Sequence, residues 1–117
     1  MVFPASGGRI NHLLDLLVTL PGLIGIGISP KDDLAESRRA IGPKLLLIGN
    51  LDNVGLRTAS AAEIRQRSMA CLCAAAPAGR YVLAHAGADI PISTPPENLH
   101  AMIDASMAYA AGERSAP

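Results

Sequence analysis

Residues 81–102, "YVLAHAGADIPISTPPENLHAM", contain a short apolar run, a polar loop and a helix start. The run at residues 81–84 is continuous rather than alternating, which is typical of strands in a parallel sheet covered on both faces. Thr94, with Pro95 at the first helical position and Glu97 three residues after Thr94, predicts a capped helix. That helix is expected to carry four inward apolar side chains, Leu99, Met102, Ile103 and Met107.

The same alternation of strand and helix extends back to the start of the chain. Continuous apolar, β-prone runs are predicted to be strands at residues 1–3, 23–28 and 44–48. The first intervening helix is predicted over residues 11–20, with Asn11 as its N-cap. Its inward stripe is expected to consist of Leu13, Leu14, Leu17 and Leu20.

Two more helices separate the later strands. One is expected to start at Ser29-Pro30, to bury Leu34 and Ile41, and to end at Gly42-Pro43. The next starts at Ser60 with Glu63 three residues on, which is the pattern of a reciprocal capping box. It is expected to run through Ile64 and Leu72 to the segment at residues 77–79.

The predicted order is therefore βαβαβαβα in a single partial domain over residues 1–117. Parallel strands joined by helical crossovers form either an open doubly wound sheet or an arc of a (β/α)8 barrel. A complete barrel needs about 250 residues and eight strands. The sequence thus predicts an α/β fold that is either an open sheet or four β/α units amounting to half a barrel.

Composition narrows the possible partners. Half of the residues are apolar, and ten Lys and Arg residues balance ten Asp and Glu residues, so no nucleic-acid partner is expected. No apolar run approaches the roughly 20 residues that span a bilayer, and residues 1–4 lack the features of a signal peptide. We therefore expect no membrane partner and a cytoplasmic location. Cys71 and Cys73 lack further soft ligands nearby, which favours buried small residues over a metal site.

In both architectures, ligands bind at the carboxyl ends of the strands. The polar residues expected there are Ser6, Ser29, Asn50, Asp52, His85 and Asp89. Asn50 and Asp52 alternate around Leu51, so they either form a ligand-binding pair or make an Asx turn. His85 lies at a strand end, where an imidazole serves either as a general acid or base or as a structural group.

Several segments resemble the carboxyl-terminal part of the uroporphyrinogen decarboxylase superfamily. They are "GNLD" at residues 49–52 and "YVLAHAGADIPISTPPENLHAMIDA" at residues 81–105. Residues 89–98 and 29–52 are similar to the corrinoid-dependent branch, of the methylcobalamin:coenzyme M methyltransferase type. The resemblance covers nearly the whole chain and implies a (β/α)8 barrel, of which these four units match the last four.

The methyltransferase branch binds zinc through a His-x-Cys and a Gly-Cys, and the matching positions here are Pro4, Ser6 and Ala88. Neither proline nor alanine can ligate zinc, and a serine hydroxyl replaces a thiolate poorly. The resemblance therefore argues against zinc-dependent methyl transfer, and we expect no metal.

The decarboxylase branch needs no cofactor, because the protonated pyrrole of the substrate acts as the electron sink. By resemblance, His85 and Asp89 are candidate catalytic residues, and Asn50 and Asp52 are candidate substrate-binding residues. The sequence departs from the pattern of the decarboxylase branch at two positions. His85 is out of register with the Gly-His-Gly of this branch, and Asn53 replaces the proline that commonly follows its "GNLD" segment.

The expected substrate is a tetrapyrrole or a corrinoid-linked compound, with doubtful activity for the half-barrel alone. Two alternatives stay open. One is a non-catalytic half-barrel that forms a homo-oligomer or pairs with a complementing half-barrel chain, since four parallel strands leave two unpaired edges. The other is an unrelated open α/β binding domain.

Overall fold

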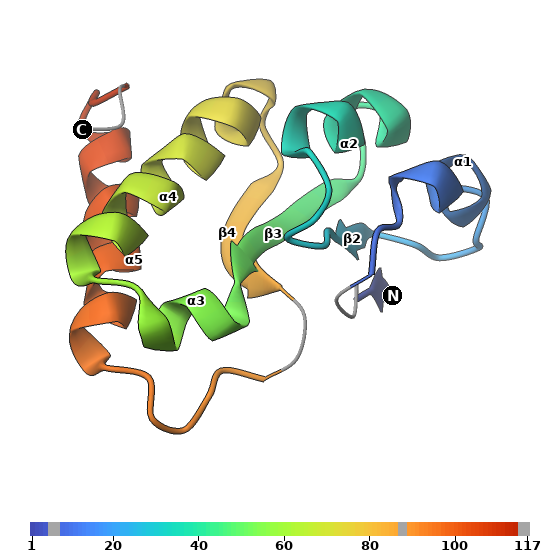
Figure 1. The fold of residues 1–117 in the computed structure, drawn as a ribbon. Coiled ribbons are helices and arrows are strands. Elements are labelled where there is room, and N and C mark those ends of the chain that lie inside the picture. The colour runs from blue at the N-terminus through green and yellow to red at the C-terminus, as the bar shows by residue number, and fades with distance from the viewer. Residues whose placement is uncertain (5–7, 87–88, 115–117) are drawn as a thin grey trace.

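The computed structural model describes residues 1–4, 8–86 and 89–114 of the 117-residue chain. Its four strands form one parallel sheet in the order β1-β2-β3-β4. They are β1 (Val2–Phe3), β2 (Gly25–Gly27), β3 (Leu46–Asp52) and β4 (Tyr81–Ala86). Figure 1 shows this sheet at the centre, with the amino terminus beside β1 and the carboxyl terminus beyond the helices at the opposite end.

The strand order decides between the two predicted architectures. Each strand pairs with the next one in the sequence, and the order never reverses direction. Because crossovers between parallel strands are right-handed, crossovers that advance in one direction place their helices on one face. A doubly wound sheet requires a reversal. The sheet is therefore an arc of a barrel, which confirms the predicted half-barrel, and the open doubly wound alternative is wrong.

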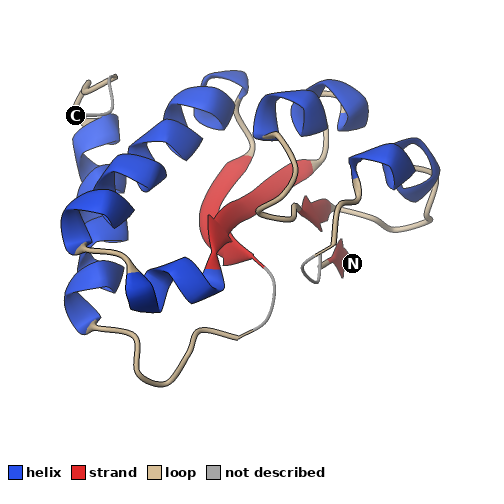
Figure 2. Ribbon diagram, viewed as in Figure 1, coloured by secondary structure: helices blue, strands red, loops and turns tan. Residues whose placement is uncertain are grey.

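The helices and short 3-10 turns follow the sheet as an outer layer (Figure 2). They are η1 (Asn11–Leu13), α1 (Leu14–Leu17), α2 (Leu34–Ile41), α3 (Asn53–Thr58), α4 (Ala61–Ala75), η2 (Ala76–Ala78) and α5 (Pro96–Ala110). Among the described residues, no helix has the length and apolar character needed to cross a bilayer.

Two apolar clusters hold these layers together. The larger one lies between the sheet and the helices α1, α2 and α4 and consists of Leu14, Ile26, Ile28, Leu34, Ile41, Leu47 and Ala75. The smaller one joins α3, α4 and α5 through Leu56, Ile64 and Ala101. The predicted inward positions Leu14, Leu34 and Ile41 are thus confirmed. Four others are wrong, since Leu13, Leu20, Ile103 and Met107 are exposed at 42%, 36%, 54% and 66%.

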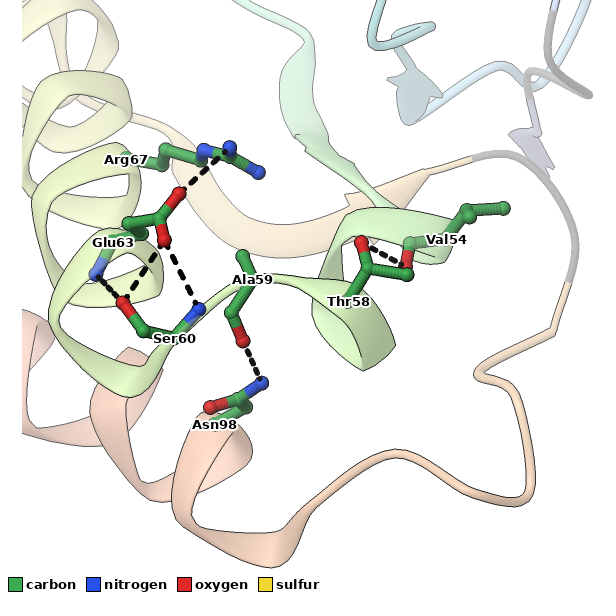
Figure 3. Close-up of polar contacts among 7 residues, drawn as sticks. All are labelled: Val54, Thr58, Ala59, Ser60, Glu63, Arg67 and Asn98. Carbon is green, nitrogen blue, oxygen red and sulfur yellow. Dashed lines mark hydrogen bonds and ion pairs between the residues drawn. The ribbon is translucent and has the colours of Figure 1, made fainter.

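The start of α4 is the capping box that the sequence predicts (Figure 3). The Ser60 Oγ accepts a hydrogen bond from the Glu63 backbone N–H at 3.1 Å, and Glu63 Oε1 accepts one from the Ser60 backbone N–H at 3.4 Å. Each side chain thereby satisfies a donor that the first turn of a helix leaves free.

The starts of the other helices differ from the predictions. The cap of α2 is Asp33, whose carboxylate accepts from Glu36 N–H at 2.9 Å, and not Ser29. Residues 29–32 instead form a turn, in which Asp32 N–H donates to the Ser29 carbonyl at 3.1 Å. An aspartate cap four residues downstream outcompetes the Ser-Pro pair because its carboxylate carries a full charge toward the helix N-terminus.

Asn11 does not cap the first helix. Its side chain donates to the Asp33 carbonyl at 3.3 Å and accepts from Ser37 Oγ at 2.6 Å, so it joins η1 to α2. The predicted cap at Thr94 is also wrong, because Pro95 is the N-cap of α5 and Pro96 takes the first helical position. The Thr94 Oγ1 is buried without a hydrogen-bond partner among the described residues.

Helix α3 is a further difference, since the sequence analysis predicts no helix over residues 53–58. Asp52 caps α3, and Leu56 on this short helix is fully buried. Gly55 in its middle lowers the intrinsic helix propensity, so the helical signal is weak in the sequence. Tertiary burial of Leu56 supplies the stabilisation that propensity lacks.

Arg38 closes the amino-terminal end of the sheet. Its guanidinium donates to the carbonyls of Gly42 at 3.0 Å and of Leu45, Gly79 and Arg80 at 2.8 Å each. These carbonyls belong to the segments that lead from α2 into β3 and from η2 into β4. One buried cation therefore fixes where two neighbouring strands begin.

Candidate functional site

The predicted site residues lie at the carboxyl ends of β3 and β4. These two strands pair in register, with Leu51 opposite His85 and Asp52 opposite Ala86. Asn50, Asp52 and His85 therefore belong to two adjacent strands at one end of the sheet, and Asp89 follows three residues after β4. Their side chains nevertheless lie in different environments and make different contacts.

The Asn50 amide is used within the protein. Its Nδ2 donates to the carbonyls of Ser29 at 2.9 Å and Asp32 at 2.8 Å, which holds the β2–α2 turn against β3. Its Oδ1 accepts from the Cys71 thiol at 3.6 Å. Three contacts thus fix the orientation of Asn50.

Asp52 makes the Asx turn that was one of its two predicted interpretations. Its Oδ1 accepts from Val54 N–H at 3.2 Å and caps α3, while the residue as a whole is exposed. Asn53 then donates through Nδ2 to the Asp89 carbonyl at 3.0 Å. Because Asn53 directly follows Asp52, this bond brings the exposed residues Asp52 and Asp89 to the same rim of the sheet, which we call the acidic rim (Asp52, Asn53 and Asp89).

His85 is directed elsewhere. It lines an apolar groove of about 410 Å³ between β4 and α5, the β4–α5 groove, together with Leu83, Leu99, Met102, Ile103 and Met107. Its Nδ1 is buried and has no hydrogen-bond partner among the described residues. The structure therefore places the Asp89 backbone beside the residue that follows Asp52, while His85 lines the apolar β4–α5 groove.

A partly buried polar network behind β3 was not predicted from the sequence. The Tyr81 hydroxyl donates to the Gly49 carbonyl, and Cys71 donates to Asn50. Burial is the main cause that raises the pKa of Tyr81 and the pKa of Cys71 above their ordinary values, so both groups stay protonated at neutral pH. Cys71 and Cys73 are both free and half-buried. The sequence feature that could have indicated this network is Tyr81, a polar aromatic residue at the start of an otherwise aliphatic strand.

Gly49 is required where this network meets the sheet. Its φ is +134°, and an added Cβ would lie 2.9 Å from the Ile28 carbonyl oxygen. A side chain would therefore be strained in backbone and would push β3 away from β2. This close approach explains the glycine in the "GNLD" segment.

The donor set does not fit the zinc site of the methyltransferase branch. Pro4 lies just after β1 and is exposed, and Ser6 and Ala88 lie outside the described residues. None of the three residue types supplies an imidazole or a thiolate. The described residues also contain no group of three or more His, Cys, Asp or Glu side chains arranged to hold a metal ion.

Comparison with known proteins agrees with this geometry. The family model of uroporphyrinogen decarboxylase (URO-D) matches residues 2–109. The chain belongs to the uroporphyrinogen decarboxylase family.

A solved methyltransferase from Methanosarcina mazei has the same fold, with a TM-score of 0.74 and 24% sequence identity over 88% of this chain. The match covers 29% of that methyltransferase, so this family member spans well under half of its length. Among curated proteins, none matches this chain. The predicted resemblance and the half-barrel are therefore confirmed, while the roles of the individual site residues stay predictions.

Proposed function

We propose that this chain forms the carboxyl-terminal wall of a uroporphyrinogen decarboxylase-type pocket that binds a tetrapyrrole at the acidic rim. The observation that carries the proposal is the hydrogen bond of 3.0 Å from the Asn53 side chain to the Asp89 backbone carbonyl, which places exposed Asp89 beside the residue that follows exposed Asp52. Pyrrole N–H groups are donors, and carboxylates accept hydrogen bonds from them more strongly than neutral acceptors do. Membership of the family supports this choice of ligand.

The reaction proposed for the completed pocket is decarboxylation of an acidic side chain on a pyrrole ring. The bond to the carboxylate breaks, its electron pair moves into the protonated ring, and CO2 leaves. A proton then adds to the exocyclic carbon, and the ring loses its proton. The role of the chain is to position the ring and to stabilise its positive charge through Asp52 and Asp89.

The proposed roles of the other two candidates differ. Asn50 supports the site indirectly, because its amide holds the turn between β2 and α2. His85 lines the β4–α5 groove beside α5 and is assigned no proton transfer. The methyl-transfer branch remains the second candidate, because residues 89–98 resemble it and a methyltransferase shares the fold.

Equilibrium dialysis against uroporphyrinogen, kept reduced under anaerobic conditions, tests the proposal. We expect saturable binding that Asp52→Asn and Asp89→Asn each weaken about tenfold or more, since a hydrogen bond to a charged group contributes roughly 1.5–3 kcal/mol. Asp15→Asn is the matched control, because Asp15 is an exposed aspartate on α1, away from the rim.

Three outcomes would contradict the tetrapyrrole proposal. They are no saturable binding, equal affinity for the rim variants and the control, and stoichiometric retention of zinc after mild chelation. Cobalamin, titrated in the same way, distinguishes the second candidate: tight binding of cobalamin with no binding of uroporphyrinogen would assign the chain to corrinoid-linked chemistry.

A further inference from the structure

The exposed large apolar side chains of the described residues come mostly from the first and last parts of the chain. Twelve large apolar residues are exposed, and eleven of them lie before β2 or from β4 onward. We call the first set the amino-end surface: Met1, Val2, Leu13, Leu16, Leu20 and Ile24. We call the second the carboxyl-end surface: Val82, Ile90, Ile92, Ile103 and Met107. Val54 is the remaining one, and it lies between them on α3.

Each set includes a residue of an edge strand, which is Val2 on β1 for the first set and Val82 on β4 for the second. In the described structure β1 pairs with β2 alone, and β4 pairs with β3 alone, so each has one free edge. Free edges present unpaired backbone donors and acceptors that readily pair with another strand. Because all four strands run parallel, a β4 edge and a β1 edge from another copy can pair in the parallel sense that the rest of the sheet uses.

We propose that two copies of this chain close into an eight-stranded barrel about a twofold axis, with β4 of each copy beside β1 of the other. Two arcs of four strands supply the eight strands of a closed (β/α)8 barrel. The arrangement has two identical interfaces, each formed by the amino-end surface of one copy and the carboxyl-end surface of the other. Closure leaves no free edge.

The register of the sheet indicates what fills the β4–α5 groove. Phe3 pairs with Ile26, Ile26 with Leu47 and Leu47 with Tyr81, so these residues share one face of the sheet. Ile26 and Leu47 are buried beneath the helices, which identifies that face as the helix side. Phe3 of the second copy, on a strand beside β4, would enter the groove lined by Leu83, Leu99 and Met102.

The terminal helices complete the same interface. In a closed ring, α5 of one copy is the neighbour of α1 of the other, because each helix packs outside its own strand. Ile103 and Met107 on α5 are exposed at 54% and 66%, and Leu13 and Leu16 at the start of the first β/α unit are exposed at 42% and 68%. Apolar patches of this kind are typical of interaction surfaces.

Sedimentation velocity and light scattering between about 1 and 100 μM test the proposal without any ligand. We expect a closed dimer of twice 12.1 kDa that does not grow further with concentration. Leu16→Glu and Met107→Glu should each raise the dimer dissociation constant at least tenfold, because each places a charge in an apolar contact. Val54→Glu is the matched control and should leave the dimer unchanged, since Val54 is equally apolar and 51% exposed but lies on neither surface.

Circular dichroism checks that the variants stay folded, which we expect because the substituted positions are exposed. A 12.1 kDa monomer across the whole range would overturn the proposal and assign the two surfaces to a different chain or segment. Open-ended growth would overturn closure. Equal weakening by Val54→Glu would show that the contact does not use the two ends. None of these results depends on tetrapyrrole binding, so the two proposals fail separately.

Discussion

Asn98→Ala removes an amide that joins α5 to the connection between α3 and α4. Asn98 is 2% exposed, and its Nδ2 donates to the carbonyls of Leu56 at 2.7 Å and Ala59 at 2.9 Å. Figure 3 shows the second of these bonds, reaching from the first turn of α5 to the residue before the capping box. The asparagine of the "TPPEN" segment therefore has a structural role that links two helix starts.

The magnitude follows from these two bonds. Each contributes about 0.5–1.5 kcal/mol net, and a buried carbonyl left without a partner costs a further 1–3 kcal/mol at most sites. Partial access of water to the exposed helix start reduces that penalty. We expect Asn98→Ala to lower the free energy of unfolding by about 2–4 kcal/mol, which is a large part of the roughly 5–15 kcal/mol of an ordinary domain.

Urea unfolding followed by circular dichroism measures this loss, at one fixed protein concentration because association shifts apparent stability. Asn53→Ala is the matched control, since Asn53 makes one exposed bond to Asp89 and should cost less than about 1 kcal/mol. A loss below about 0.5 kcal/mol for Asn98→Ala, or equal losses for both variants, would refute the reasoning.

Asn98→Asp adds a pH test of the same contact. A carboxylate facing two carbonyl oxygens is disfavoured, so the pKa of the new acid rises in the folded state above about 3.9, its value in the unfolded chain. Stability relative to the native chain should then be highest near pH 4 and should fall as pH rises toward the folded-state pKa. A deficit that does not change between pH 4 and pH 7 would contradict the proposed geometry.

Three further predictions concern the support of the sheet. Arg38→Met keeps an apolar stem but removes four hydrogen bonds to carbonyls, so we expect a loss of about 3–5 kcal/mol in urea unfolding; a loss under 1 kcal/mol would show that water replaces the guanidinium. Gly49→Ala should cost at least about 2 kcal/mol more than Gly79→Ala, because both glycines have positive φ but only Gly49 faces a backbone oxygen, and equal costs would refute the steric argument. In a Cys73→Ser background, burial raises the pKa of Cys71, so iodoacetamide should modify it at pH 8 more slowly than in the urea-unfolded chain, and stability should decrease as pH rises past about 8.5; equal rates in both states would contradict this.

The capping residues show which helix starts can be predicted from local sequence alone. The reciprocal pattern at Ser60 and Glu63 was predicted correctly, because both partners lie within one turn and need no other part of the fold. The caps of α2 and α5 were placed wrongly, because several serine, threonine, aspartate and proline residues precede each helix and compete for the same role. Packing against the sheet decides which of them begins the helix.

The candidate site was likewise predicted only where the signals are local in the sequence. The sequence indicated that Asn50, Asp52, His85 and Asp89 follow strands, since apolar runs and turn residues are local signals. It could not indicate that the Asn50 amide donates to the carbonyls of Ser29 and Asp32, or that His85 faces α5. Those directions depend on residues that lie 18 and 21 positions away for Asn50 and 14 or more positions away on α5 for His85.

The sequence by itself determined the alternation of strands and helices, the parallel sheet, the half-barrel length and the family resemblance, because each depends on periodicity, chain length or short motifs. Only the tertiary structure decided that the sheet winds in one direction, that Arg38 holds the amino ends of β3 and β4 while Asn98 joins α5 to α3, and that most exposed large apolar residues belong to the first and last parts of the chain. Strand order and side-chain direction are set by burial against residues that are distant in the sequence. A local sequence pattern does not specify which of those residues will be the packing partner.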